Sequence, residues 1–200
     1  MATTYITLVN DTLRRLNEVT LDTAGDGFTT VRNVQGLVKD AVNNSIRLII
    51  QDGQEFPFLK TTNTQTLVTA QRTYNFPTDM GTVDLDSFFL KKTSGLANTP
   101  RPLRTITYND YLQNYRTQDD EGDQTNGVSK PLYVYQTLEE KFGITPLTDA
   151  AYEVEYVYFT FPADLTAHTD TTVIPDRFKH VIVDGAIMFV MRFRSNEQSA

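Results

Sequence analysis

The chain has 200 residues, enough for one sizeable domain or for a domain that carries an insertion. Its formal net charge is −7, whereas a protein that grips nucleic acid by the phosphates needs a surplus of Lys and Arg. The chain has no cysteine, which excludes disulfides, thiolate metal ligands and cysteine nucleophiles. No apolar run approaches the length of a transmembrane span, so no membrane partner is expected.

Apolar residues recur at three- and four-residue steps near both ends of the chain, which is the pattern of an amphipathic helix. The spacing predicts one helix over 4–18 and a second helix over 31–51. A third helix is expected after Ile174, because Pro175 suits the first position of a helix and Asp176 favours its positive end.

The middle of the chain is rich in proline and threonine, which favour turns and extended structure over helix. Its last run alternates with period two, and this predicts a strand with one row of side chains facing a core. That row is Tyr152, Val154, Tyr156 and Tyr158. Strands are predicted over 64–68, 72–76, 83–91, 132–136, 141–145 and 152–160, with a short helix over 108–116.

Helical ends and a β-rich middle predict an α+β fold. The simplest architecture is a helical bundle built from the N- and C-terminal helices, with an antiparallel β domain inserted between them. We expect residues 1–55 to form the N-terminal helix pair and residues 56–165 to form the inserted β-rich domain with its one short helix. Residues 166–200 then form the C-terminal helix and a tail that returns to the bundle.

Neither histidine forms a convincing catalytic or metal-binding pattern. His180 has Asp176 and Asp184 four residues to either side, but a metal site usually needs a third or fourth strong ligand, so local surface ion pairs are the better interpretation. His168 lies in a polar stretch, and no Gly-x-Ser-x-Gly nucleophile motif occurs. The sequence therefore indicates a protein without catalytic residues, cofactor or metal.

Two acidic segments are predicted to be solvated or partner-facing loops. One runs over 119–126, and its acids lack the alternating spacing of a calcium-binding EF-hand. The other connects the first two helices, and its glycines lack the spacing of a phosphate-binding loop. The acids in question are Asp22 and Asp26 in the connecting loop, and Asp119, Asp120, Glu121 and Asp123 in the later one.

Six short motifs follow one another in a fixed order along the chain. They are Phe56-Pro57-Phe58-Leu59, Gln65-Thr66, Tyr74-x-Phe76-Pro77-x-Asp79, Lys130-Pro131-Leu132-Tyr133, Ile144-Thr145-Pro146 before Tyr152-x-Val154-x-Tyr156, and Ile174-Pro175-x-x-Phe178. In this order the chain resembles the head-to-tail adaptor, or tail tubular protein A-like, family of tailed phages. That family often has glycine before the tyrosine of the third motif, where this chain has Ala70-Gln71.

The resemblance implies a structural protein of the virion, made in the host cytoplasm and placed at the head-tail junction. It would form a homo-oligomeric ring, commonly of twelve subunits, between the portal protein and a tail or nozzle protein. DNA would pass through the lumen without specific binding, and an acidic subunit fits this because it repels phosphate.

The C-terminal end is the expected portal contact, because adaptors of this kind commonly engage the portal through C-terminal segments. Arg192, Phe193 and Arg194 combine an aromatic anchor with flanking charge, which is enriched at interfaces. Two alternatives stay open: a carbohydrate- or receptor-binding β module of a tail component, and an enzyme that uses dispersed carboxylates. The terminal helices argue against the first, and no identifiable pair of acids supports the second.

Overall fold

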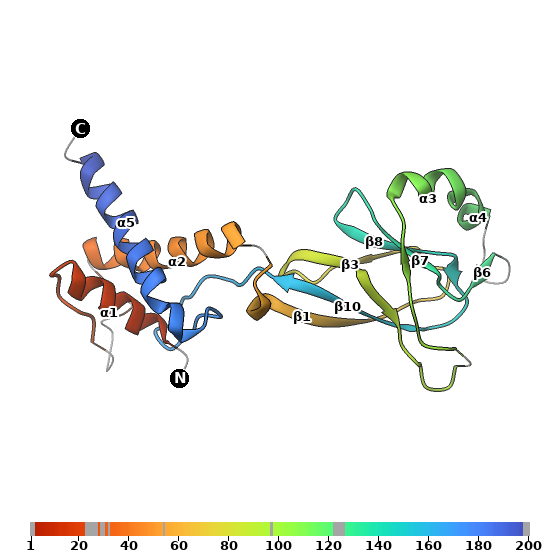
Figure 1. Ribbon diagram of the computed structural model, residues 1–200, viewed down its shortest axis with the longest axis horizontal. Coiled ribbons are helices and arrows are strands. Elements are labelled where there is room, and N and C mark those ends of the chain that lie inside the picture. Colours follow the sequence, from red (N-terminus) through yellow and green to blue (C-terminus); the bar gives the residue numbers. More distant parts are fainter. Residues whose placement is uncertain are drawn as a thin grey trace. The chain divides into compact units, whose positions relative to one another are not determined.

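The computed structural model describes residues 3–22, 28, 31, 33–53, 55–96, 98–121 and 127–197. It contains both helices and antiparallel sheets, so the predicted α+β class is confirmed (Figure 1). The chain forms two compact units. We call Met1–Leu59 with Phe161–Ala200 the helical unit, and Lys60–Thr160 the β unit.

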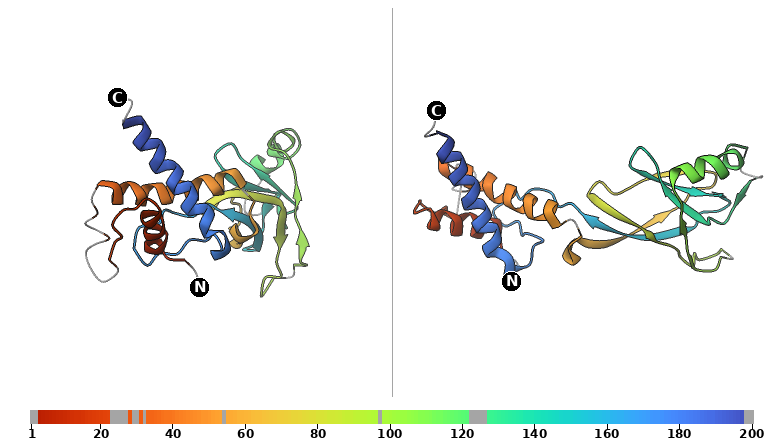
Figure 2. Two further views of the ribbon diagram at one scale, coloured as in Figure 1. Left: turned by 60° about the vertical axis from the view of Figure 1, so that its left-hand side comes forward. Right: turned by 45° about the horizontal axis from the view of Figure 1, so that its top comes forward.

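The helical unit contains three long helices, all near the predicted positions. Along α1 the buried side chains recur at helical spacing and include Tyr5, Leu8, Val9 and Leu13, because one face of the helix packs against the unit's core. In both views of Figure 2, α5 crosses α2. The helices are α1 (Tyr5–Arg15), α2 (Asn33–Gly53) and α5 (Lys179–Glu197), with single 3-10 turns η2 (Pro57–Leu59) and η3 (Asp176–Phe178).

The helices α2 and α5 approach each other closely at Ser45 and Gly185. The Ser45 hydroxyl donates to the carbonyl of Ile182 at 2.9 Å. A Cβ atom on Gly185 would lie 2.3 Å from Ser45 Oγ, so only glycine allows this approach. The small residue on each helix therefore sets their separation, and the buried neighbours Val42, Ile46, Ile182 and Ala186 complete the contact.

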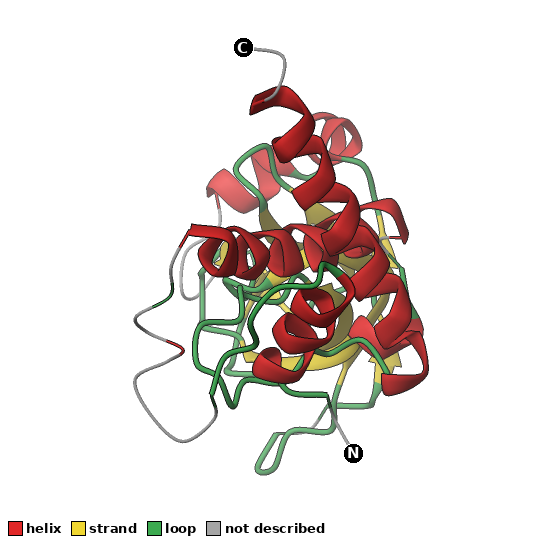
Figure 3. Cartoon of the chain, turned by 90° about the vertical axis from the view of Figure 1, so that its left-hand side faces the viewer, coloured by secondary structure: helices red, strands yellow, loops and turns green. Residues whose placement is uncertain are grey.

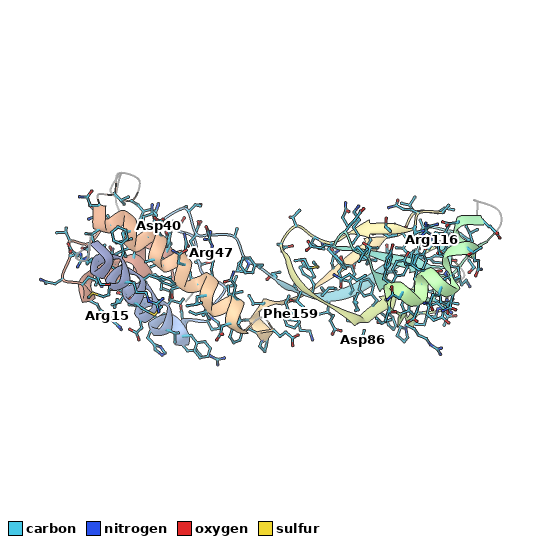
Figure 4. All side chains as sticks on the ribbon, turned by 90° about the horizontal axis from the view of Figure 1, so that it is seen from above. Arg15, Asp40, Arg47, Asp86, Arg116 and Phe159 are labelled. Carbon is cyan, nitrogen blue, oxygen red and sulfur yellow. The ribbon has the colours of Figure 1, made fainter. Side chains whose placement is uncertain are left out.

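Ion pairs connect α1 to α5 at the surface of the unit. Arg15, labelled in Figure 4, pairs with Asp184, and Lys179 lies 3.2 Å from Asp11. These groups are solvent-exposed to varying degrees, so each pair contributes only about 0–1 kcal/mol. Figure 3 looks onto this unit, where the long helices cross one another. The pairs orient the helices, while the apolar core supplies most of the stability.

The unit boundaries lie between 59 and 60 and between 160 and 161, whereas the sequence placed them near 55 and 165. The reason is local bonding to α2. The backbone of Leu165 donates to Asn43 Oδ1 at 3.1 Å and accepts from Asn43 Nδ2 at 3.0 Å. Asp164 pairs with Arg47, the α2 side chain labelled in Figure 4. The segment after the last strand therefore belongs with the helices.

The β unit contains two four-stranded sheets and a small two-stranded one. Two helices, α3 (Tyr108–Asn114) and α4 (Arg116–Glu121), are part of the same unit. The first sheet has the order β1 (Lys60–Thr66), β10 (Glu153–Thr160), β3 (Met80–Leu90), β4 (Arg101–Pro102). The second has the order β2 (Thr73–Asn75), β8 (Lys141–Thr145), β7 (Tyr133–Gln136), β5 (Arg104–Thr105), and β6 (Val128–Ser129) pairs with β9 (Leu147–Thr148).

Aromatic rings form the core of the β unit. The ring of Phe88 stacks on Tyr156 with 4.5 Å between centroids, and Phe142 contacts both rings. The predicted alternation along β10 is confirmed, because the side chains on one face of this strand are all buried. Those side chains are Val154, Tyr156 and Tyr158, with Tyr152 just before the strand.

Three details of the sequence prediction differ from the structure. Pro175 does not open α5 but precedes the turn η3, and α5 begins at Lys179. Residues 119–121, which were expected in a loop, belong to α4. The short strands β4, β5, β6 and β9 were missed, because two residues are too few to carry a periodic pattern.

Replacing glycine by alanine should have opposite effects on stability at Gly185, where α2 and α5 approach closely, and at Gly36, which lies away from this contact. Gly185→Ala should lower the free energy of unfolding by about 1–3 kcal/mol, because the new methyl group overpacks against Ser45. Gly36→Ala is the matched control. Its Cβ would meet only Val31 Cγ2 at 3.7 Å, so it should stabilise by about 0.5–1 kcal/mol through helix propensity. Urea denaturation of both variants measures this, and equal shifts would contradict it.

Ala70 is one of the two residues that stand where the family that this chain resembles often has glycine. Its φ is 59°, in the left-handed region that favours glycine. The conformation is held from both sides, since Ala70 donates to the carbonyl of Thr148 at 3.0 Å and Gln71 donates to that of Val68 at 3.0 Å. The turn therefore keeps the shape of a glycine turn although the residue is alanine.

Replacing Ala70 by glycine should therefore stabilise the β unit. The substitution relieves a left-handed conformation that costs an alanine about 1 kcal/mol, part of which is offset by the greater freedom of glycine when unfolded. We expect a rise of about 0.5 kcal/mol in the free energy of unfolding. Thermal unfolding of Ala70→Gly beside the parent protein checks this, and a fall in the melting temperature would refute it.

Candidate assembly surface

The C-terminal helix α5 carries apolar side chains on nearly all sides. One side packs against α2 through Ile182, Ala186 and Val190, which are buried. On the remaining surface, Val181 is 42% exposed and Met191 is 51% exposed. A helix that is apolar all round is normally enclosed by protein, and here part of it faces solvent. This exposed surface is the first feature that suits a binding role.

A hollow of about 470 Å³ lies in the helical unit near the start of α5, and we call it the apolar groove. It is lined by apolar side chains from three places in the chain. Arg177 also lines it, and its guanidinium lies 4.8 Å from the centre of the Phe178 ring. The apolar lining is Ile49 of α2, Phe56 and Phe58 around η2, and Ile174, Phe178 and Val181 near α5.

The groove brings together two of the six sequence motifs that carried the family resemblance. Phe56-Pro57-Phe58 and Ile174-Pro175-x-x-Phe178 are far apart in sequence, yet both line the same hollow. The rings of Phe56 and Phe58 stack with 5.0 Å between centroids. Sequence reasoning named these residues as motifs but did not expect them to meet, since no local pattern joins them.

The three residues expected at the portal contact differ in their availability. The side chain of Phe193 is 47% exposed and Arg192 is exposed. Arg194 is half-buried, and its guanidinium lies 2.6 Å from Glu18. This pair joins the end of α5 to the segment after α1. Arg192 and Phe193 therefore face solvent, while Arg194 already has an intramolecular partner.

The acidic residues expected in loops are distributed differently. Asp22 is exposed, and Asp26 and Asp123 lie outside the described residues. Glu121 is exposed at the end of α4. Asp120 is also on α4, where it accepts from Arg72 at 2.6 Å and from Arg116 at 3.3 Å. The hydrogen bond from Arg72 holds the pKa of Asp120 below its ordinary value.

Asp119 corrects the sequence prediction most clearly, because it is buried rather than partner-facing. Only 2% of the residue is exposed, on the inner side of α4. Burial raises the pKa of its carboxyl, although Thr145 and the backbone of Leu147 favour the charged form. Acidic residues are rarely buried without a strong partner, and Asp119 stands in a run of acids. The sequence therefore gave no reason to expect that Asp119 is buried.

A second hollow of about 420 Å³ lies in the β unit, beside α3 and the turn between β7 and β8. Its walls include Tyr108 and the stacked rings of Tyr111 and Tyr135, whose centroids are 4.1 Å apart. Its cations already have acidic partners, because Arg72 and Arg116, the latter labelled in Figure 4, share Asp120. Lys141 likewise lies 2.6 Å from Glu139. Each of these cations is therefore paired with an acid, although Arg72 Nε has no hydrogen-bond partner among the described residues.

The two histidines lie at the surface. His180 is exposed on α5, and the acids near it in sequence have other partners, since Asp184 pairs with Arg15 and Asp176 accepts from Thr3. His168 is exposed, with its ring 6.2 Å from that of Phe28. Within the described ranges, no group of three or more His, Asp or Glu side chains is placed to hold a metal ion. In the same ranges no helix is long and apolar enough to cross a membrane.

An exposed apolar helix surface and an apolar groove are features that suit contact with other proteins. The family model of the SU10 adaptor protein matches residues 3–200, so the chain belongs to this family of phage head-to-tail adaptors. The resemblance drawn from the six motifs is thereby confirmed. Membership identifies a structural protein of the virion that contacts other head and tail components. No curated protein matches the sequence.

The buried carboxyl of Asp119 predicts a pH-dependent stability. The pKa of Asp119 is raised in the folded state. Its contribution to the stability of the fold is therefore fully present below the unfolded pKa of about 3.9, and it is lost as the pH rises through the folded pKa. Asp119→Asn is uncharged at every pH. It should therefore be more stable than the parent by about 1 kcal/mol at neutral pH.

The measurement is the melting temperature of both proteins from pH 4 to pH 7. We expect the advantage of Asp119→Asn to shrink as the pH falls, because the parent then becomes protonated as well. Gln118→Asn, which changes an exposed and uncharged residue of α4, is the control, and its difference from the parent should not vary with pH. A constant difference for Asp119→Asn across the whole range would show that the carboxyl is not protonated on folding.

Proposed function

We propose that the protein forms a homo-oligomeric ring between the portal protein and a tail or nozzle protein, with DNA passing through its lumen. Membership of the adaptor family supports a junction role. The observation that carries the ring is the surface of α5. Apolar side chains that a single helical unit leaves exposed become covered when units pack side by side. A ring needs such head-to-tail contacts between different surfaces of identical copies.

The portal contact is proposed at the end of α5, through Arg192 and Phe193. An exposed aromatic ring beside an exposed guanidinium is a common anchor at protein interfaces. Arg194 takes a different role in this proposal. Its pair with Glu18 supports the helix end on which the anchor is carried. The exposed acids Asp22 and Glu121, with Asp26 and Asp123, remain candidates for contacts to the tail side.

The charge of the chain supports passage of DNA without specific binding. A net charge of −7 in each copy repels phosphate wherever the acids face the lumen. In the described residues most arginines near the surface are already paired, as with Arg15, Arg47 and Arg116. Such pairing reduces the attraction that unpaired cations would exert on DNA.

Electron microscopy of purified portal, with and without the adaptor, tests this function. Collars of extra density on the portal support the proposal. A protein that leaves the portal bare and instead binds glycans would favour the carbohydrate-binding alternative. The ring itself is tested on the same images, since class averages along the axis show its rotational symmetry.

The portal contact predicts a specific loss on changing Phe193. Phe193→Ser should leave the chain folded, because the ring is about half exposed, and should weaken portal binding at least about thirtyfold. Val19→Ser is the matched control, since Val19 is also an exposed apolar residue but lies in the segment after α1. Surface plasmon resonance on immobilised portal measures both. Unchanged affinity of Phe193→Ser would move the contact away from the end of α5.

A further inference from the structure

The strand β1 is the longest edge strand of the β unit. It pairs with β10 over seven residues, and no strand in the described part of the chain pairs with its other side. The other sheet ends are much shorter, since β4 and β5 have two residues each and β2 has three. A free edge of this length presents backbone donors and acceptors that can pair with another chain.

The edge of β1 lacks most of the features that usually prevent such pairing. It contains no proline, and its register with β10 runs without a shift from Lys60 to Thr66. Between its ends every residue is an uncharged Thr, Asn or Gln. By contrast, β3 is broken by register shifts and carries Asp84 and Asp86. Bulges and charges of that kind protect an edge, whereas β1 has no bulge and its one charged residue, Lys60, stands at its first position.

The hydrogen-bond pattern identifies the backbone groups that point outward. Leu67 donates to the carbonyl of Tyr152 at 2.7 Å, which makes this pair a hydrogen-bonded one. In an antiparallel ladder such pairs alternate, so Lys60, Thr62, Thr64 and Thr66 turn their backbone groups to the free side. The carbonyl of Thr66 accepts from the Gln65 side chain at 2.8 Å. No described residue bonds the outward backbone groups of Thr62 and Thr64.

We propose that β1 of one copy pairs antiparallel with β1 of a second copy, about a two-fold axis at Asn63. In this register Thr62 lies opposite Thr64 of the second copy. Both residues have outward backbone groups, so they exchange hydrogen bonds with each other. The two sheets then join into one continuous sheet. The partner is a second copy because the edge is complementary to itself.

The side chains suit this register. Thr62 and Thr64 form cross-strand threonine pairs, which are favourable on a sheet surface. Lys60 lies opposite Thr66 rather than opposite a second Lys60, so like charges are kept apart. All four outward residues are exposed, and no side chain has to leave a buried position. A contact made by one short strand covers little surface, so the dimer is weak and reversible.

This dimer is separate from the proposed ring. Neighbours in a ring are related by rotation about one shared axis, whereas β1 pairing needs a two-fold axis between the copies. The dimer therefore belongs to the protein before assembly, and it must open when the copies join a ring. The two proposals can fail independently, because the ring is tested on complexes with the portal and the dimer is tested on the free protein.

Sedimentation velocity of the whole chain over a rising concentration series tests the dimer. The parent should shift from monomer to dimer. Thr64→Pro removes an outward N–H that the monomer does not use, so it should weaken dimerisation at least about tenfold. Thr64→Val keeps that N–H and is the matched control, which should dimerise like the parent. A parent that stays monomeric at every concentration would overturn the proposal.

Cysteine crosslinking tests the register and does not depend on how well Thr64→Pro folds. The chain has no native cysteine, so a single introduced thiol reports one contact. In the proposed register Asn63 lies opposite its own copy at a Cα distance of about 4.5 Å, within reach of a disulfide. Asn63→Cys should form a covalent dimer on mild oxidation, whereas Ser129→Cys, at an exposed position on β6, should not. Equal crosslinking of both variants would refute the β1 contact.

Discussion

The helical unit depends on the close approach of α2 and α5. Ser45 and Ile182, which share the hydrogen bond at this crossing, are 137 residues apart in the chain. The approach is possible because Gly185 has no side chain. Once α5 lies against α2, the segment before it is brought beside η2, and the apolar groove forms there. The same packing uses one side of α5 and leaves the opposite apolar side exposed.

The β unit differs from the helical unit, because it buries its apolar side chains in its own core. Its apolar side chains meet in an aromatic cluster around Phe88, Phe142 and Tyr156. What it leaves unpaired is backbone, along the edge of β1. The two units therefore offer different kinds of contact: apolar side-chain surface on one and strand edge on the other. Separate surfaces of different chemistry allow one chain to bind different partners, including a second copy of itself.

The α+β class, the long helices and most strands were predictable from the sequence, because each has a local period. The lysine at the start of β8 and the threonine at its end were predicted to the residue. The boundary of the helical unit depends on tertiary bonds, as at Leu165, which joins this unit through Asn43. The surface was harder to predict. Phe193 was named from its residue type and is exposed, but the partner of Arg194 and the burial of Asp119 depend on distant segments.

The sequence by itself determined the absence of cysteine chemistry, the acidic charge, the periodic elements and the ordered motifs that carry the family. These are properties of composition and of neighbours in the chain. The tertiary structure alone decided that Phe56 and Phe178 line one groove, that Ala70 adopts the left-handed conformation, and that β1 is an edge. Each of these depends on contacts between residues far apart in sequence, and such contacts leave no periodic trace in a single chain.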